Sequence, residues 1–178
     1  MHSTETEVII IGGGPVGLII ALELDRQGIN CLLVNNQLET AVHPKANAIN
    51  SRSMEHFRRH GIASKIRSSG LPSDYPTDVT YVTRLTGYEL ARLSMRSSSV
   101  AVQEAKNSNS VYDCSEPPHR CSQIYLEKIL YDEVLNRTRI DVRFGHEFEE
   151  FKEINGGVTA KIRDLSNSTN YYVGAKYL

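Results

Sequence analysis

The sequence has few cysteines, no excess of charge of one sign and no long uninterrupted hydrophobic run. Three cysteines in 178 residues (Cys31, Cys114 and Cys121) are too few and too scattered for a disulfide framework. We therefore expect reduced, intracellular thiols. The 20 basic and 21 acidic residues nearly cancel, so nothing in the charge predicts binding to nucleic acid or to an anionic membrane.

The most apolar stretch, residues 8–24, is interrupted by Gly-Gly-Gly-Pro at residues 12–15. It is too short and too broken to cross a bilayer. Residues 1–7 are polar and acidic, the opposite of the start of a signal peptide. We therefore expect a soluble, cytoplasmic protein. Its charged fraction of 23% and its length are typical of a globular chain with a buried core.

Residues 7–34 have the pattern of a βαβ unit. Residues 7–11 and 29–34 are short apolar runs of the kind found in parallel strands buried on both faces. Between them, residues 18–27 change from apolar to polar on one side and end at Gly28, as a helix does. This order predicts an α/β fold with a Rossmann-like parallel sheet.

The turn between this first strand and helix carries the motif Gly12-x-Gly14-x-x-Gly17. In a dinucleotide site the first glycine allows a tight turn, the second lets the backbone approach a pyrophosphate, and the third lets the helix pack on the sheet. Pro15 stands in the first helical turn, where its missing N–H costs nothing. The alternative is a tight glycine turn that binds no ligand.

The second part of a dinucleotide fingerprint is altered. Such sites place Asp or Glu at the end of the second strand to hold ribose hydroxyls, whereas Asn35 stands there. Loss of the charge-assisted hydrogen bond predicts an affinity about tenfold lower or more. Glu39 lies in the following loop and is a poor substitute. Alternatively, Asn35 is only the polar end of a strand.

The remaining pattern predicts helices at residues 52–60, capped by Asn50 or Ser51, and at residues 123–137. It also predicts a strand at 140–144 and a strand starting at 171. Antiparallel hairpins are expected at 78–93, and at 147–154 with 158–165 around Asn155-Gly156-Gly157. The serine-rich residues 96–109 predict a mobile surface segment.

Three segments carry a resemblance to a known family: residues 12–18 (GGGPVGL), residues 43–55 (HPKANAINSRSME) followed by Gly61-Ile62, and residues 120–130 (RCSQIYLEKIL). In this order they resemble the N-terminal part of the single-component FAD-dependent aromatic monooxygenases. That family includes p-hydroxybenzoate hydroxylase, phenol hydroxylase and polyketide hydroxylases. The resemblance implies FAD as cofactor, NAD(P)H as co-substrate and a small aromatic substrate that becomes hydroxylated.

The resemblance also implies roles for individual residues. Gly12, Gly14, Pro15 and Val16 would meet the FAD pyrophosphate. Lys45 and Ala46 would lie along the flavin and its phosphates, and Gln123 would touch the flavin side. Asn35 would face the adenosine. The alternatives are a solvated loop lysine at 45 and a water-facing Gln123. For Arg52 we expect either flavin support or pairing with Glu55 or Glu39.

Members of this family are more than twice as long, so the resemblance implies a fragment, a truncated gene product or a mis-predicted gene. The implied domains are the first part of the FAD-binding domain at 1–75, the start of the substrate sheet at 76–115, and the continued FAD-binding domain at 116–178. A missing C-terminal half or a second copy would then be a partner. If that partner covers the parallel strands, the isolated chain should expose apolar surface and aggregate.

No residue of the chain is assigned a catalytic role, because most substrate residues would lie in the absent part. We also expect no metal site, since Cys114, His119 and Cys121 give at most three ligands at a spacing unlike zinc motifs. Two other functions stay open. One is a non-catalytic remnant with weak or no FAD binding, and the other is an NAD-binding oxidoreductase of another family.

Overall fold

The computed structural model describes residues 4–43, 45–107, 114–154 and 156–178. The chain divides into two compact units: unit 1 is Met1–Lys45 with Gln123–Leu178, and unit 2 is Ala46–Ser122. Unit 1 contains the predicted α/β fold. Unit 2 is an excursion between its second and third parallel strands.

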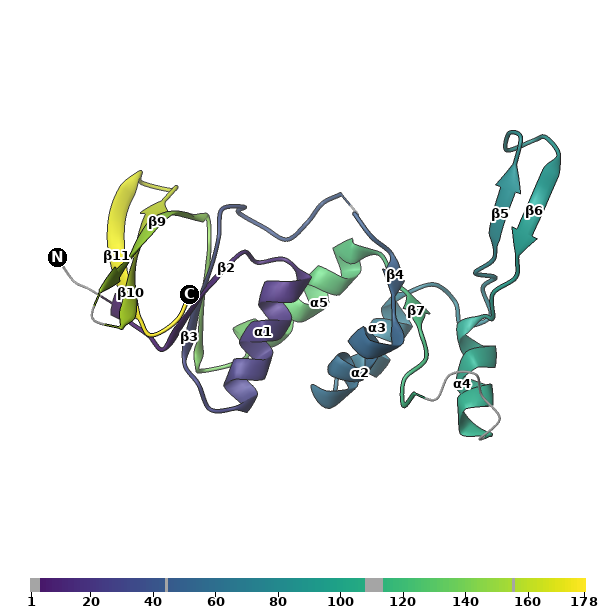
Figure 1. Cartoon of the computed structure of the whole chain (residues 1–178), viewed down its shortest axis with the longest axis horizontal. Helices are drawn as coiled ribbons and strands as arrows, with labels where there is room; N and C mark the ends of the chain where they lie inside the picture. Colours follow the sequence, from purple (N-terminus) through teal and green to yellow (C-terminus); the bar gives the residue numbers. More distant parts are fainter. Residues whose placement is uncertain (1–3, 44, 108–113, 155) are drawn as a thin grey trace. The chain divides into compact units, whose positions relative to one another are not determined.

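Unit 1 is built on a parallel sheet of β2 (Val8–Ile11), β3 (Cys31–Asn35) and β8 (Ile140–Phe144), in the order β2-β3-β8. Helix α1 (Pro15–Arg26) connects β2 to β3, which confirms the predicted βαβ unit. The helix begins three residues earlier than predicted because Pro15 has a φ suited to the first helical position. Helix α5 (Gln123–Leu135) leads into β8 and packs beside α1 (Figure 1).

A second sheet covers the other face of these strands. It consists of β1 (Thr4–Glu5), β9 (His146–Ile154), β10 (Gly157–Asp164) and β11 (Thr169–Ala175), in the order β1-β11-β10-β9. The sheet is antiparallel except for its edge strand β1, which pairs with β11 in parallel. The predicted hairpin is confirmed as β9 and β10, and Asn155 of its predicted turn lies outside the described residues. Unit 1 therefore has three layers, with helices and an antiparallel sheet on opposite faces of the parallel sheet (Figure 1).

The core of unit 1 lies on both sides of the parallel strands. Toward the antiparallel sheet, Ile9, Leu32 and Val34 pack with Ala160, Ile162 and Val173. Ile10 points the other way, toward Gly17 of α1. The chain thus covers β2 and β3 by itself, so the condition under which these strands were expected to cause aggregation is not met. The reason is that β9 and β10, predicted as a hairpin, and β11, predicted as a separate strand, form a second layer.

The last residues of unit 1 lie beside β2. Tyr177 forms a parallel bridge with Val8, and the carbonyl oxygen of Tyr177 accepts the N–H of Ile9 at 3.0 Å. The strand predicted from residue 171 is therefore present as β11, and the chain then turns to the free edge of β2.

Unit 2 contains the short antiparallel pair β4 (Ala48–Ile49) and β7 (His119–Arg120) and the helices α2 (Ser51–Arg59), α3 (Ala63–Ser69) and α4 (Ser98–Lys106). Asn50 caps α2, because its side chain accepts the N–H of Ser53 at 2.8 Å. The predicted hairpin at 78–93 is confirmed as β5 (Val79–Val82) and β6 (Glu89–Leu93).

Residues 96–109, expected to be a mobile surface segment, contain a helix, because residues 98–106 form α4. Residues 108 and 109 lie outside the described residues. Ser97 caps this helix through the N–H of Val100, and Ala101 is buried. Serine favours such capping positions, so the serine-rich composition marks a helix start. Helix α3 was not predicted. Its Arg67 donates to the Glu116 carboxylate, the Ser98 hydroxyl and the Pro117 carbonyl, a contact that local sequence does not reveal.

The contacts group residues 46–75 with residues 76–122. This is a division by packing, and the domain boundaries implied by the family resemblance stay a prediction. Among the helices of the described residues, none has the length and apolar character needed to span a membrane.

Candidate functional site

The glycine turn after β2 has a backbone that only glycine suits. Gly12 has φ +107°, a conformation that L side chains rarely adopt, and its N–H donates to Val34 at 2.8 Å. A Cβ on Gly17 would lie 2.0 Å from the Gly12 carbonyl oxygen, and one on Gly13 would lie 2.4 Å from the Phe144 ring. The turn is therefore pressed against both α1 and the end of β8.

The outer side of this turn is open. A Cβ on Gly14 would meet no described atom within 4 Å. Gly14 is the N-cap of α1 and offers no side-chain cap, Pro15 follows it, and the first turn has no acidic residue. The first N–H groups of a helix lack intrahelical acceptors and carry the positive end of the helix dipole. The place is suited to an anion such as a pyrophosphate.

Asn35 ends β3 beside this turn, where it is half-buried and paired in register with Phe144. Its Cβ would lie 3.0 Å from a Cβ on Gly13. Within the described part of the chain, no hydrogen bond is seen from the Asn35 side chain. Glu39 is exposed in the following loop. The structure thus puts an uncharged amide, not a carboxylate, next to the open glycine turn.

Lys45 and Gln123 meet in unit 1. The backbone N–H of Lys45 donates to Gln123 Oε1 at 3.2 Å, and Gln123 Nε2 donates to Glu127 Oε1. Lys45 is exposed and Gln123 is half-buried. Ala46 is exposed and belongs to unit 2. Arg52 pairs with Glu55 at 3.3 Å, with its side chain largely exposed.

Glu127, within the motif at residues 120–130, contacts the same loop as Gln123, and the sequence alone assigned it no role. It is only 4% exposed, and its Oε2 accepts the N–H of Ala41 at 2.9 Å. A buried carboxylate on an otherwise apolar helix face is a usable sequence signal, because such groups are rarely buried without specific partners. The motif spacing Gln123-x-x-x-Glu127 places both residues on one side of α5.

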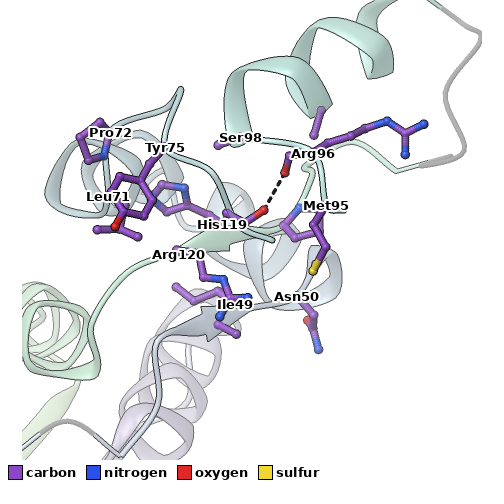
Figure 2. Close-up of a pocket in the computed structure, with 14 residues that line it drawn as sticks. Ile49, Asn50, Leu71, Pro72, Tyr75, Met95, Arg96, Ser98, His119 and Arg120 are labelled. Carbon is purple, nitrogen blue, oxygen red and sulfur yellow. Dashed lines mark hydrogen bonds between the residues drawn. The ribbon is translucent and has the colours of Figure 1, made fainter. Parts of the chain in front are cut away.

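Unit 2 contains a cavity of about 280 Å³. Its wall is mainly apolar and includes Ile49, Leu71, Pro72, Tyr75, Met95 and Ala101 together with His119 and Arg120 (Figure 2). His119 is 5% exposed, and neither of its ring nitrogens has a hydrogen-bond partner among the described residues. Burial, followed by the nearby Arg67 charge, lowers the pKa of His119 below 6.5. A neutral imidazole thus lines an apolar cavity.

The cysteines give no sign of metal binding or redox chemistry. Burial raises the pKa of Cys31 to about 11 and also raises that of Cys121, so both are protonated thiols at neutral pH. All three cysteines are free. In the described ranges, no three His, Cys, Asp or Glu side chains lie close enough together to hold a metal ion.

Comparison with known families gives a match over almost the whole chain. Residues 5–178 match a family described as FAD binding domain. The chain is 31% identical over 176 residues to 2,4-dichlorophenol 6-monooxygenase of Delftia acidovorans, covering 98% of this chain and 29% of that protein. It is 35% identical over 193 residues to tetracenomycin A2 monooxygenase-dioxygenase of Streptomyces glaucescens, covering 100% of this chain and 32% of that one.

Solved structures also match the fold of this chain. The flavin-dependent monooxygenase PieE, in complex with FAD and substrate, matches with a TM-score of 0.86 and 31% identity over 100% of this chain and 30% of that one. The rebeccamycin biosynthetic enzyme RebC matches with a TM-score of 0.83 and 34% identity, again over 100% of this chain and 33% of that one. This chain thus spans about a third of the length of the proteins it matches.

Proposed function

Because this chain belongs to the FAD-binding domain family found in FAD-dependent aromatic and polyketide monooxygenases, we propose that it works as the N-terminal, FAD-binding part of a flavin monooxygenase. The complete enzyme would use NAD(P)H to hydroxylate an aromatic compound. The observation that carries the proposal is the open glycine turn at the start of α1, whose N–H groups and dipole suit a pyrophosphate.

The individual contacts come from the family resemblance, and the geometry of the turn supports them. Gly12, Gly14, Pro15 and Val16 would receive the pyrophosphate, since Gly14 leaves open space and Val16 is 70% exposed at the helix start. Asn35 would hydrogen-bond the ribose of the adenosine through a neutral amide. A hydrogen bond from this neutral amide would hold the ribose less tightly than one from a carboxylate.

Lys45, Ala46 and Gln123 would lie along the flavin side. The exposed Lys45 ammonium suits a dianionic pyrophosphate, and Gln123 keeps spare hydrogen-bonding capacity beyond its contacts to Lys45 and Glu127. When bound, FAD supplies the redox and oxygen chemistry. The residues of this chain bind and orient the cofactor, and the proposed domain division assigns 1–75 and 116–178 to that task.

The cavity of unit 2 supports an aromatic substrate. Its volume and mainly apolar wall suit an aromatic ring. Residues 76–115 would then begin the substrate sheet. A remaining partner, either the absent part of the monooxygenase or a second copy, would complete the site.

An FAD titration of the purified chain tests the proposal, read by flavin fluorescence and visible absorbance. We expect saturable FAD binding in the micromolar range and no binding of NAD under the same conditions. This result would distinguish the proposed FAD-binding function from that of an NAD-binding oxidoreductase. Absence of FAD binding at high micromolar concentration would favour the non-catalytic remnant. Addition of the absent half of a related monooxygenase and an aromatic substrate then tests NAD(P)H oxidation.

A further inference from the structure

A line of hydrogen bonds joins the first turns of α5 to the loop after β3. The N–H of Lys45 donates to Gln123 Oε1, Gln123 Nε2 donates to Glu127 Oε1, and the N–H of Ala41 donates to Glu127 Oε2. All of these residues belong to unit 1. Two backbone positions of the loop are thus held by two side chains one turn apart on the same helix.

The direction of these bonds explains why the buried group is a carboxylate. Both backbone groups are donors, so the side chains must accept at both ends. The side-chain amide of Gln123 accepts a hydrogen bond from Lys45 and donates one to Glu127. The Glu127 carboxylate accepts two hydrogen bonds and donates none. Only an acceptor with two oxygens can end the line, and an ionised carboxylate is such a group. Hydrogen bonds to a charged acceptor are also stronger than neutral ones.

We propose that Glu127 is a positioning residue that, through Gln123, fixes the loop carrying Lys45 for cofactor binding. Glu127 itself does not touch the cofactor. Glu127 is 4% exposed, and both of its carboxylate oxygens accept a hydrogen bond. It orders the loop before the ligand arrives, so the entropic cost of ordering the loop on binding is smaller. This inference rests on the proposed function for its effect on FAD, but the loop order itself is independent of it.

The test compares E127Q, Q123E and the double variant Q123E/E127Q. In E127Q, two amides face each other, and whichever way they turn, one donor meets another donor. In Q123E, two carboxylates face each other. In the double variant, the carboxylate at position 123 accepts from Lys45 and from the amide at position 127, whose oxygen accepts from Ala41. All three hydrogen bonds return with the same composition and net charge.

The first measurement is amide hydrogen exchange at Ala41 and Lys45 in the cofactor-free chain. We expect protection at both positions to fall about tenfold or more in each single variant and to return in the double variant. D132N is the matched control, because Asp132 pairs with Lys128 on the exposed face of the same helix. It should leave both amides unchanged.

The second measurement is the FAD dissociation constant of the same variants. We expect it to rise about tenfold or more in E127Q and to stay unchanged in D132N. Unchanged exchange in E127Q, or no rescue of exchange in the double variant, would overturn the proposal. If exchange behaves as expected but the unaltered chain binds no FAD, the proposed function fails and the positioning of the loop by Glu127 stands. If exchange is rescued but the FAD constant is unaffected throughout, the link to cofactor binding is overturned.

Discussion

The carbonyl oxygen of Gly12 occupies the place where a side chain on Gly17 would begin: a Cβ there would lie only 2.0 Å away. Gly14, between them, has no described atom within 4 Å of its Cβ position. The two glycines of one motif thus have different tasks. Gly17 lets α1 approach the turn, and Gly14 leaves space outside it.

We therefore expect Gly17→Ala and Gly14→Ala to separate folding from binding. Gly17→Ala should destabilise unit 1 by about 2–4 kcal/mol, because the contact is with backbone that cannot move aside. Gly14→Ala should change stability by less than about 0.5 kcal/mol yet abolish FAD binding at micromolar concentration. Chemical denaturation and FAD titration measure the two effects. Equal loss of stability in both variants would contradict this assignment.

Asn35 offers a gain-of-affinity test. A carboxylate at this position should make a charge-assisted hydrogen bond to the ribose, so Asn35→Glu should tighten FAD binding about tenfold. The exposed neighbour Asn36 provides the control, since Asn36→Asp adds the same charge one residue further on. An unchanged dissociation constant in Asn35→Glu would mean that Asn35 is only the polar end of β3.

His119 predicts a pH dependence of stability. Its pKa in the folded chain lies below the ordinary value of 6.5 because burial and Arg67 disfavour the charged ring. The unfolded chain therefore takes up the proton first, and stability falls as the pH is lowered below about 6.5. The slope from one such group is at most about 1.4 kcal/mol per pH unit.

The loss of folding stability that His119 causes at low pH should be absent in His119→Leu, because leucine does not take up a proton. Denaturation midpoints of both proteins between pH 7.5 and about 5 measure the difference. Parallel pH profiles for the two proteins would show that another group causes the loss of stability.

The parallel strands are covered, but the β5–β6 hairpin exposes apolar side chains. Leu85, Tyr88 and Leu90 are 99%, 83% and 69% exposed. A two-stranded hairpin is marginally stable alone, and apolar patches of this kind favour association. We expect the chain to self-associate at high concentration in light scattering, and L85S/L90S to reduce this without lowering the melting temperature. A monodisperse original chain would contradict the expectation.

Several features followed from the sequence alone. The apolar runs and glycine spacing of residues 7–35 predicted β2, α1 and β3, because short-range periodicity encodes which faces are buried. Gly12 and Gly17 were assigned their steric tasks from the motif, and the geometry agrees. The capping of α2 by Asn50 and the two hairpins are also local signals.

Tertiary structure decided the rest, since it depends on contacts between residues far apart in the chain. That β9, β10 and β11 cover the parallel strands depends on the long-range packing of Ile162 and Val173 on Leu32. Helix α3 is held by Arg67 through residues about fifty positions away. Glu127 gains its role only because folding brings Ala41, 86 residues away, to its carboxylate. Local pattern fixes which residues are strand or helix, whereas burial and hydrogen-bond partners follow from the fold.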